Sequence, residues 1–270
     1  MSTNSSPDFP EYAHTAGVWN RIAAWWDDRI GNGNDFQDIL IEPTTERLLE
    51  IQPGDEVLDI ACGAGRFARR MAACGTRVCA FDYAEKFIER ARKRTTVNRD
   101  RIEYHVLDAT SPDALLSLGK KRFDAAVCTM ALMDMSSIEP LISCLPQMLK
   151  QNGRFVFSVL HPVFNSGTCR RIAEESFQDG RLVTKVGVVV TDYLQPFAHR
   201  GIGVPGQPEL QYYFHRPLSV ISNTCFKHGC VLDRIEEPAF PESPEDASGS
   251  ISWHNMPSIP PVLVARMLLK

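Results

Sequence analysis

The segment from Val57 to Gly65, Val-Leu-Asp-Ile-Ala-Cys-Gly-Ala-Gly, constrains the fold of this 270-residue chain more than any other. Its apolar part, 56–61, predicts a buried strand that passes through a glycine-rich turn into a helix over 66–74. Glycine tolerates positive φ and lets the backbone approach a ligand closely. The helix start then presents unpaired N–H groups with partial positive charge. The segment therefore predicts a ligand site where a strand meets its helix.

Short apolar runs and amphipathic stretches alternate on both sides of a long central insertion, which predicts a parallel sheet covered by helices on both faces. The expected strands are 56–61, 76–81, 102–107, 123–129, 154–160, 230–236 and 262–269. The expected helices between them are 66–74, 84–96, 111–118, 138–149 and 216–228. Seven strands in one sheet are compatible with a single large α/β domain of this length.

Two regions depart from the alternation. The first eleven residues are small and polar and are expected to be disordered. Two helices are expected to follow, 15–30 and 36–50, and Pro43 is a candidate bend in the second. Residues 161–215 read as irregular apart from one β-branched run over 183–191, which indicates an inserted cap. The predicted organisation is a tail and helical lid (1–43), a core (44–160), a substrate cap (161–215) and the end of the core (216–270).

Charge and cysteine content narrow the functional classes. The net charge is −4 with a pI of about 6.0, and no basic stripe is present, which disfavours a nucleic-acid partner. No apolar run reaches the roughly 20 residues that span a bilayer, and the N-terminus lacks a signal-peptide core, so a cytoplasmic protein is expected. The eight cysteines form no C-x-x-C pair, and Cys225, His228 and Cys230 lack a fourth ligand, so we expect reduced thiols and no metal.

The glycine turn allows two interpretations. Gly63 to Ala68 fits the dinucleotide pattern G-x-G-x-x-G/A, and Asp82 lies at a suitable distance for a ribose contact, which predicts an NAD(P)-dependent oxidoreductase. Asp59 argues against this reading, because a carboxylate beside a pyrophosphate is repulsive whereas one beside an ammonium is attractive. Alternatively, Asp59 only caps or pairs near the helix start.

The carboxylates continue along the chain, since Asp82 and Asp108 close the next two predicted strands. Asp59 followed by a Gly-x-Gly turn resembles the first motif of class I S-adenosylmethionine-dependent methyltransferases. The resemblance covers about 44–160 and, more loosely, the last 55 residues, and implies a Rossmann-like, seven-stranded, mostly parallel sheet with S-adenosyl-L-methionine as cofactor. It assigns the methionine part of the cofactor to Asp59, Ala61, Cys62, Gly63 and Gly65.

The same resemblance assigns the nucleoside. Asp82 would accept hydrogen bonds from the ribose hydroxyls and Tyr83 would pack on adenine. Asp108, with Ala109, would meet the exocyclic amine, and Met130 and Ala131 would line the cofactor. Both Asp82 and Asp108 have an alternative role as helix caps.

Two further groups of residues are candidates for covering the bound cofactor and for lining the acceptor pocket. By resemblance, Trp25 or Trp26 of the first helix would lie over the sulfonium as a lid, whose charge suits an aromatic face. Alternatively, Trp19, Ile22 and Trp26 form a core stripe at helical spacing. The aromatic cap predicts a partly apolar acceptor pocket, and its candidate lining residues are Met133, Phe164, Tyr213 and Arg216.

A base is required only if the acceptor must lose a proton. His161, directly after the fifth strand, is the first candidate, with a structural hydrogen bond as the alternative, and His215 is the second. Arg216 would bind an acidic acceptor or merely begin the following helix. The sequence thus predicts a methyltransferase that O- or N-methylates a small molecule, with a homodimer as its candidate assembly. An oxidoreductase or a non-catalytic cofactor-binding module remain the alternatives.

Overall fold

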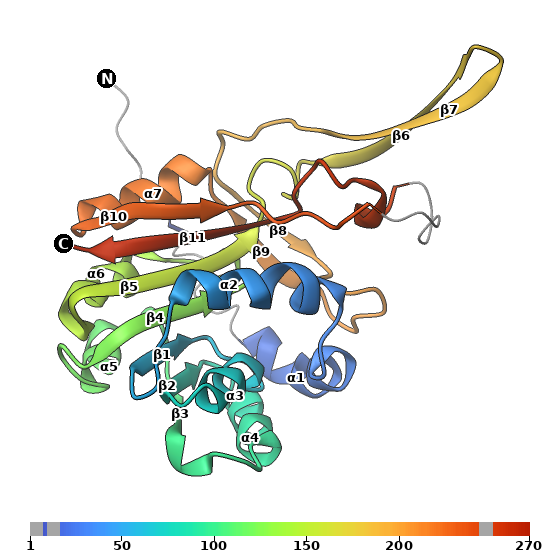
Figure 1. Cartoon of the computed structure of the whole chain (residues 1–270). Helices are drawn as coiled ribbons and strands as arrows, with labels where there is room; N and C mark the ends of the chain where they lie inside the picture. The colour runs from blue at the N-terminus through green and yellow to red at the C-terminus, as the bar shows by residue number, and fades with distance from the viewer. Residues whose placement is uncertain (1–7, 10–16, 243–250) are drawn as a thin grey trace.

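A seven-stranded sheet forms the centre of the computed structural model, which describes residues 8–9, 17–242 and 251–270 (Figure 1). Its strands are β1 (Glu56–Ile60), β2 (Arg77–Asp82), β3 (Ile102–Val106), β4 (Phe123–Thr129), β5 (Leu149–Leu160), β10 (Cys230–Glu236) and β11 (Val262–Leu269). Their order is β10-β11-β5-β4-β1-β2-β3. Neighbours from β3 to β5 are parallel, whereas β11 is antiparallel to both β5 and β10. The expected seven-stranded, mostly parallel sheet is confirmed.

Helices cover both faces of this sheet. They are α1 (Gly17–Ile30), α2 (Glu42–Leu49), α3 (Arg66–Ala73), α4 (Glu85–Arg94), α5 (Pro112–Ser117), α6 (Glu139–Met148) and α7 (Leu218–Lys227). Successive residues of a strand point to opposite faces, so Val57 joins the apolar cluster with α2 and α3, and Leu58 the cluster with α5, α6 and α7. Among the described residues, no helix has the length and apolarity to cross a membrane.

The helix expected over 36–50 is two segments. A π-helical stretch, Phe36–Ile41, leads into α2, and Pro43 lies in the first turn of α2. Proline has no N–H to donate, and the first turn of a helix is where that loss costs least. The proline therefore marks the point at which one hydrogen-bonding pattern replaces the other.

The cap region is more regular than its sequence indicates. It contains one hairpin of β6 (Arg170–Gln178) and β7 (Arg181–Val189) and another of β8 (Phe197–Gly201) and β9 (Gln211–His215). The run expected over 183–191 overlaps β7, but the other three strands were not anticipated. The β6–β7 hairpin projects away from the sheet (Figure 1), and its residues are mostly exposed. An exposed strand needs no apolar alternation, which removes the usual sequence signal for it.

Two residues of the N-terminal tail make defined contacts, although 1–11 was expected to be disordered. The Phe9 N–H donates to the carbonyl of Ser136 at 2.8 Å, and the Asp8 carboxylate accepts from the Ser137 hydroxyl at 2.7 Å. The ring of Phe9 lies 5.3 Å from the guanidinium of Arg216. The rest of that expectation concerns residues outside the described ranges.

Candidate active site

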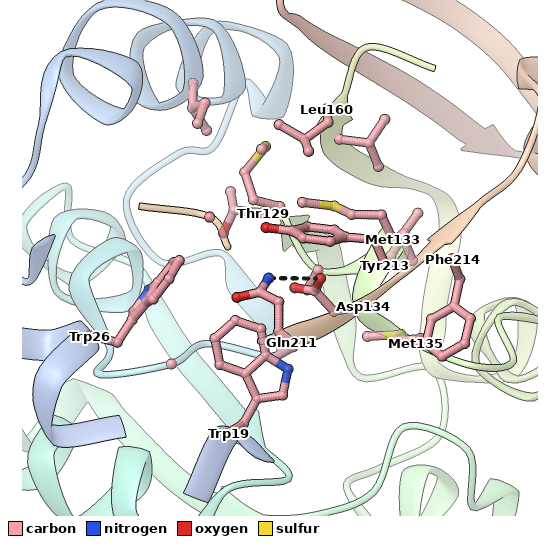
Figure 2. A pocket seen from close by; sticks show the side chains of 18 of the residues that line it. Trp19, Trp26, Thr129, Met133, Asp134, Met135, Leu160, Gln211, Tyr213 and Phe214 are labelled. Atoms are coloured by element: carbon pink, nitrogen blue, oxygen red, sulfur yellow. Dashed lines mark hydrogen bonds between the residues drawn. The ribbon is translucent and has the colours of Figure 1, made fainter. Parts of the chain in front are cut away.

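A cavity of about 760 Å³ opens at the carboxyl ends of β1, β2 and β4. Small-molecule and cofactor sites typically have roughly 300–1,000 Å³. Its walls come from the turn after β1, the ends of β2, β3 and β4, helix α1 and the β8–β9 hairpin. Figure 2 shows the part of the cavity in which Trp19 and Trp26 face Asp134, Gln211 and Tyr213. Ligands of open parallel sheets bind at this edge.

The two glycines of the turn have different surroundings. Gly63 has a φ of +53°, and a Cβ added there would have no atom within 4 Å, because the residue borders the open cavity. Gly65 has a φ of +72°, and a Cβ there would lie 2.4 Å from the Tyr104 hydroxyl oxygen. Gly63 lines the cavity together with Ala61 and Cys62, whereas Gly65 does not. The cofactor contact expected of Gly65 is therefore replaced by a packing role beneath the turn.

Asp59 lies under the turn and not in the cavity. Its side chain is fully buried, and its two carboxylate oxygens have no hydrogen-bond partner among the described residues. Burial, with the nearby charge of Asp82, raises the pKa of Asp59 to about 8. Asp59 does not line the cavity, so the structure gives no support to the direct contact with the cofactor predicted for it.

Asp82 lines the cavity and also organises the backbone around it. One carboxylate oxygen accepts the N–H of Gly63 and the other that of Ala84, each at 2.8 Å. Burial raises the pKa of Asp82 to about 6, against the lowering effect of these two hydrogen bonds. A carboxylate oxygen offers a second lone pair, so the helix-entry role and a ligand role are compatible in this residue.

Asp108 closes the third strand in a similar way. The Thr110 N–H and hydroxyl both donate to the same carboxylate oxygen of Asp108 at 2.8 Å. Asp108 and Ala109 line the cavity, as does Tyr83, whose side chain is 45% exposed at the rim. The ends of β2 and β3 therefore bring Asp82 and Asp108 to one wall, as the sequence predicted.

Helix α1 covers the cavity with two tryptophans. Trp19 and Trp26 line it and meet edge to face, with ring centroids 5.4 Å apart. Trp25, proposed as an alternative to Trp26, does not line the cavity and packs against Trp26 at 6.1 Å. Arg94 pairs with the buried Asp27 at 2.6 Å and so fastens α1 to α4. The lid and the core-stripe interpretations therefore describe the same helix, because Trp26 belongs to both.

The wall after β4 holds the candidate acceptor side. Met130, Ala131 and Met133 line the cavity there, as predicted, and Asp134 lies beside them. The Gln211 side-chain amide donates to the Asp134 carboxylate at 3.4 Å (Figure 2). Burial raises the pKa of Asp134 well above its usual range.

Sequence reasoning missed Asp134 and Gln211 as site residues. A single acidic residue inside the apolar run Met-Ala-Leu-Met-Asp-Met was the signal for Asp134, because an isolated carboxylate among apolar residues is costly unless it has a role. For Gln211, which reaches the cavity from the β8–β9 hairpin, the sequence offers no comparable signal.

His161 and Phe164 lie outside the cavity lining, which corrects both expectations. The Nε2 atom of His161 is 2.8 Å from a Glu237 carboxylate oxygen, and its Nδ1 accepts the N–H groups of Val163 and Phe164 at 3.2 and 3.4 Å. Burial lowers the pKa of His161 against the opposing effect of Glu237. Both ring nitrogens are occupied, so the residue shapes the chain after β5 and offers no free base to the cavity.

His215 and Arg216 do line the cavity. The His215 Nε2 donates to the Tyr193 carbonyl at 2.8 Å, and burial lowers the pKa of His215. The Arg216 guanidinium donates to the carbonyls of Met135 and Ser136 at 3.0 and 2.9 Å, and burial lowers its pKa to about 10. Because these donors bind backbone carbonyls, Arg216 holds the loop after β4 in place. Arg216 does not begin the following helix, since α7 starts at Leu218.

The sheet order, the glycine turn and the carboxylates at the strand ends together define a nucleotide-cofactor site of the Rossmann-like type. The buried carboxyl groups of Asp59 and Asp82 favour a cationic ligand over a diphosphate, because a nearby cation stabilises their charged forms and a diphosphate does not. The open space over Gly63 leaves room for it.

Comparisons with known proteins agree. Residues 57–153 match the methyltransferase domain family. The chain is 28% identical over 160 residues to a demethylmenaquinone methyltransferase of Tropheryma whipplei, covering 58% of this chain and 64% of that enzyme. It is also 28% identical over 156 residues to a ubiquinone biosynthesis O-methyltransferase of Pelagibacter ubique, covering 53% and 62%. In both cases the alignment spans less than two thirds of the relative.

The fold is also found among solved structures. An S-adenosylmethionine-dependent methyltransferase from Mesorhizobium loti superposes with a TM-score of 0.61 at 22% identity, covering 84% of this chain and 96% of that one. The family match over residues 57–153 and the shared fold support a class I S-adenosylmethionine-dependent methyltransferase with S-adenosylmethionine as its cofactor.

Proposed function

We propose that this methyltransferase acts on a small organic acceptor at oxygen or nitrogen. The observation that carries the proposal is the continuous cavity, which runs from the glycine turn at Gly63 to an aromatic region around Tyr213 under the cap. Cofactor and acceptor would share it, with Met133 between the two. Apolar and aromatic walls around a few polar groups are typical of small-molecule sites.

For the cofactor part of the cavity, we assign the roles of the family pattern to those residues that line it. In this proposal Asp82 binds the ribose, Tyr83 packs on adenine and Asp108 meets its amine. Ala61, Cys62, Gly63, Met130 and Ala131 contact the remaining cofactor atoms. When bound, S-adenosylmethionine supplies an electrophilic methyl group on a positively charged sulfur.

The chain's own contribution is alignment and the exclusion of water. Trp19 and Trp26 would cover the methyl group with their aromatic faces, which are attracted to positive charge. Holding the acceptor in line with the carbon–sulfur bond can supply roughly 7–11 kcal/mol of the barrier. Tight packing of α1 against the β8–β9 hairpin supports this role, since a Cβ on Gly203 would lie 2.5 Å from Trp26.

The names of the relatives support an acceptor with a flat ring, because they methylate precursors of quinones. The oxidoreductase alternative is disfavoured by the carboxylates beside the turn, which repel a pyrophosphate. The division into lid, core and cap belongs to the same proposal. A cytoplasmic location and a homodimer remain predictions from the sequence.

Isothermal titration calorimetry and a transfer assay test the proposal together. We expect S-adenosylhomocysteine to bind with micromolar affinity and NADH to produce no heat. Tritium from methyl-labelled S-adenosylmethionine should then appear on at least one member of a panel of phenols, amines and carboxylic acids. Tight cofactor binding without transfer to any member of a broad panel would indicate a non-catalytic module instead.

A further inference from the structure

The loop after β4 places one carboxylate in the acceptor part of the cavity. Asp134 ends a short 3-10 turn, Leu132–Asp134, and its side chain points toward Gln211 and Tyr213 (Figure 2). Trp19 and Trp26 face it from α1, across the cavity. Asp134 thus lies in the part of the cavity where an acceptor would sit.

The surroundings of Asp134 leave its charge without compensation. Among the described residues, the hydrogen bond to its carboxylate comes from the neutral amide of Gln211, at a long 3.4 Å. The charged group that acts on it most is Asp82, which is also negative. The Arg216 guanidinium lies against this loop, but it donates its hydrogen bonds to the backbone carbonyl oxygens of the loop. A partly buried carboxylate of this kind is stabilised by a cationic partner.

The loop that carries Asp134 is held on both sides. Arg216 donates to the carbonyls of Leu132, Met135 and Ser136, which flank Asp134. Phe9 covers Arg216 from outside and binds the Ser136 carbonyl through its own N–H. Such support fixes the position of a functional side chain at small entropic cost on binding. The carboxylate is therefore presented to the cavity by a rigid loop.

We propose that Asp134 binds the methyl acceptor and that this acceptor is a small amine, which enters the aromatic chamber of Trp19, Trp26 and Tyr213 as an ammonium ion. This inference rests on the proposed function and names its substrate class. A carboxylate combined with aromatic faces is a chemistry that recognises ammonium groups. The same carboxylate repels an acidic acceptor, the class that had been considered for Arg216.

The carboxylate also receives the proton that methylation requires. The ammonium gives one proton to Asp134, which frees the nitrogen lone pair. That lone pair forms the new bond to the methyl carbon while the carbon–sulfur bond breaks and its electron pair stays on sulfur. The products are a methylammonium ion, neutral S-adenosylhomocysteine and a protonated Asp134, whose proton then passes to solvent, so charge and atoms balance.

Three matched probes test the proposal without turnover. Tryptamine, tryptophol and indole-3-acetate share an indole and differ in carrying an amine, a hydroxyl or a carboxylate. Titrated into the protein loaded with S-adenosylhomocysteine, tryptamine should bind at least about 10-fold more tightly than tryptophol, and indole-3-acetate least. In Asp134→Asn the preference for tryptamine over tryptophol should disappear.

A proton count gives a second readout. Burial raises the pKa of Asp134 in the free protein and a bound ammonium would lower it, so ammonium binding should release more protons from the wild type than from Asp134→Asn, as measured in buffers of different ionisation enthalpy. The comparison of the two proteins cancels the other titratable groups that line this cavity, which are Asp27, Glu42, Cys62, Asp82, Asp108, Tyr83, His199, Tyr213, His215, Arg66, Arg171 and Arg216.

Controls separate this inference from the proposed function. Asp134→Glu keeps the charge and should retain part of the preference, whereas Asp113→Asn, on the exposed surface of α5, should behave as wild type. Unchanged S-adenosylhomocysteine affinity and melting temperature establish that Asp134→Asn is folded. Equal binding of the three probes, no binding of tryptamine, or an unchanged preference in Asp134→Asn overturns the inference. Failure of the wild type to bind S-adenosylhomocysteine would instead overturn the proposed function.

Discussion

Individual carboxylates account for most of the chemistry of this site, and their positions differ although they follow the same sequence pattern. Asp59, Asp82 and Asp108 each lie at or near the end of a consecutive strand. Asp82 and Asp108 line the cavity and Asp59 lies beneath it. Sequence position thus predicts the edge of the sheet correctly, while the depth of each side chain depends on its distance from the end of the strand. Asp82 is the last residue of β2 and Asp108 follows β3, whereas Asp59 comes before the last residue of β1.

Replacing Asp82 should weaken cofactor binding. We expect Asp82→Ala to lower S-adenosylhomocysteine affinity by about 1–3 kcal/mol, or roughly 5- to 150-fold, because hydrogen bonds to a charged acceptor are lost. The turn would also lose the bond from the Gly63 N–H. Calorimetric titration measures the effect, with Asp113→Ala as the surface control. An affinity equal to that of the wild type would remove Asp82 from the site.

Asp59 should make the ligand-free protein less stable as the pH rises. Its pKa is about 8 in the folded state and about 3.9 in an unfolded chain, so the folded state binds the proton more tightly. The resulting stabilisation is complete below about pH 4 and is lost as the pH rises to about 8. Asp82 and Asp134 shift in the same direction.

Melting temperatures between pH 5 and 8.5 test this expectation. The wild type should lose stability over that range, and Asp59→Asn should show a flatter profile because the titrating group is gone. The absolute stability of the variant also includes an unsatisfied buried amide, so the slopes are compared and not the values. Parallel slopes for the two proteins would contradict the buried, unpaired state of Asp59.

At the scale of elements, one strand–turn–helix unit provides both the packing and the opening of the site. The turn between β1 and α3 contains three residues of positive φ, which are Ala61, Gly63 and Gly65. Gly63 faces open space and Gly65 faces Tyr104. The G-x-G pattern therefore combines two separate requirements, one for the ligand and one for the fold.

Alanine at these two glycines should have opposite consequences. A Cβ at positive φ destabilises the folded state of both variants by roughly 1–2 kcal/mol, but only Gly65→Ala also forces Tyr104 to move. We expect Gly65→Ala to have the lower melting temperature, by at least about 2 °C. Gly63→Ala should remain more stable and lose most S-adenosylhomocysteine affinity, because its methyl group enters the cavity. A reversed order in either measurement would refute this division of roles.

At the scale of the whole molecule, the core is independent of the tip of the projecting hairpin. Figure 1 shows β6 and β7 extending beyond the layers of the fold. Near the base, Val186 and Val188 pack against the core, whereas at the tip Phe177 is 79% exposed and Leu182 is 56% exposed. The tip thus contributes little buried apolar area, on which stability mainly depends.

Shortening the hairpin should leave the fold and the cofactor site intact. Glu175 pairs with Thr184 in the ladder, so residues 176–183 can be replaced by Asn-Gly, a sequence that favours a two-residue hairpin turn. We expect the melting temperature to change by less than about 2 °C and S-adenosylhomocysteine affinity to be unchanged. The double variant Val186→Ala/Val188→Ala, at the base, is the contrasting control and should melt lower. A loss of cofactor binding on shortening would show that the tip reaches the site.

The local sequence determined the alternating strands and helices, the glycine turn and the edge of the sheet at which the carboxylates lie. These follow from periodicity and backbone preference, which act over a few residues. Only the tertiary structure decided three hydrogen bonds in and around the site. The His161 ring pairs with Glu237, Arg216 donates to the loop after β4, and Gln211 donates to Asp134. Glu237, Arg216 and Gln211 reach partners 76 to 81 residues away in the chain, and a contact of that kind depends on how the whole sheet and cap pack.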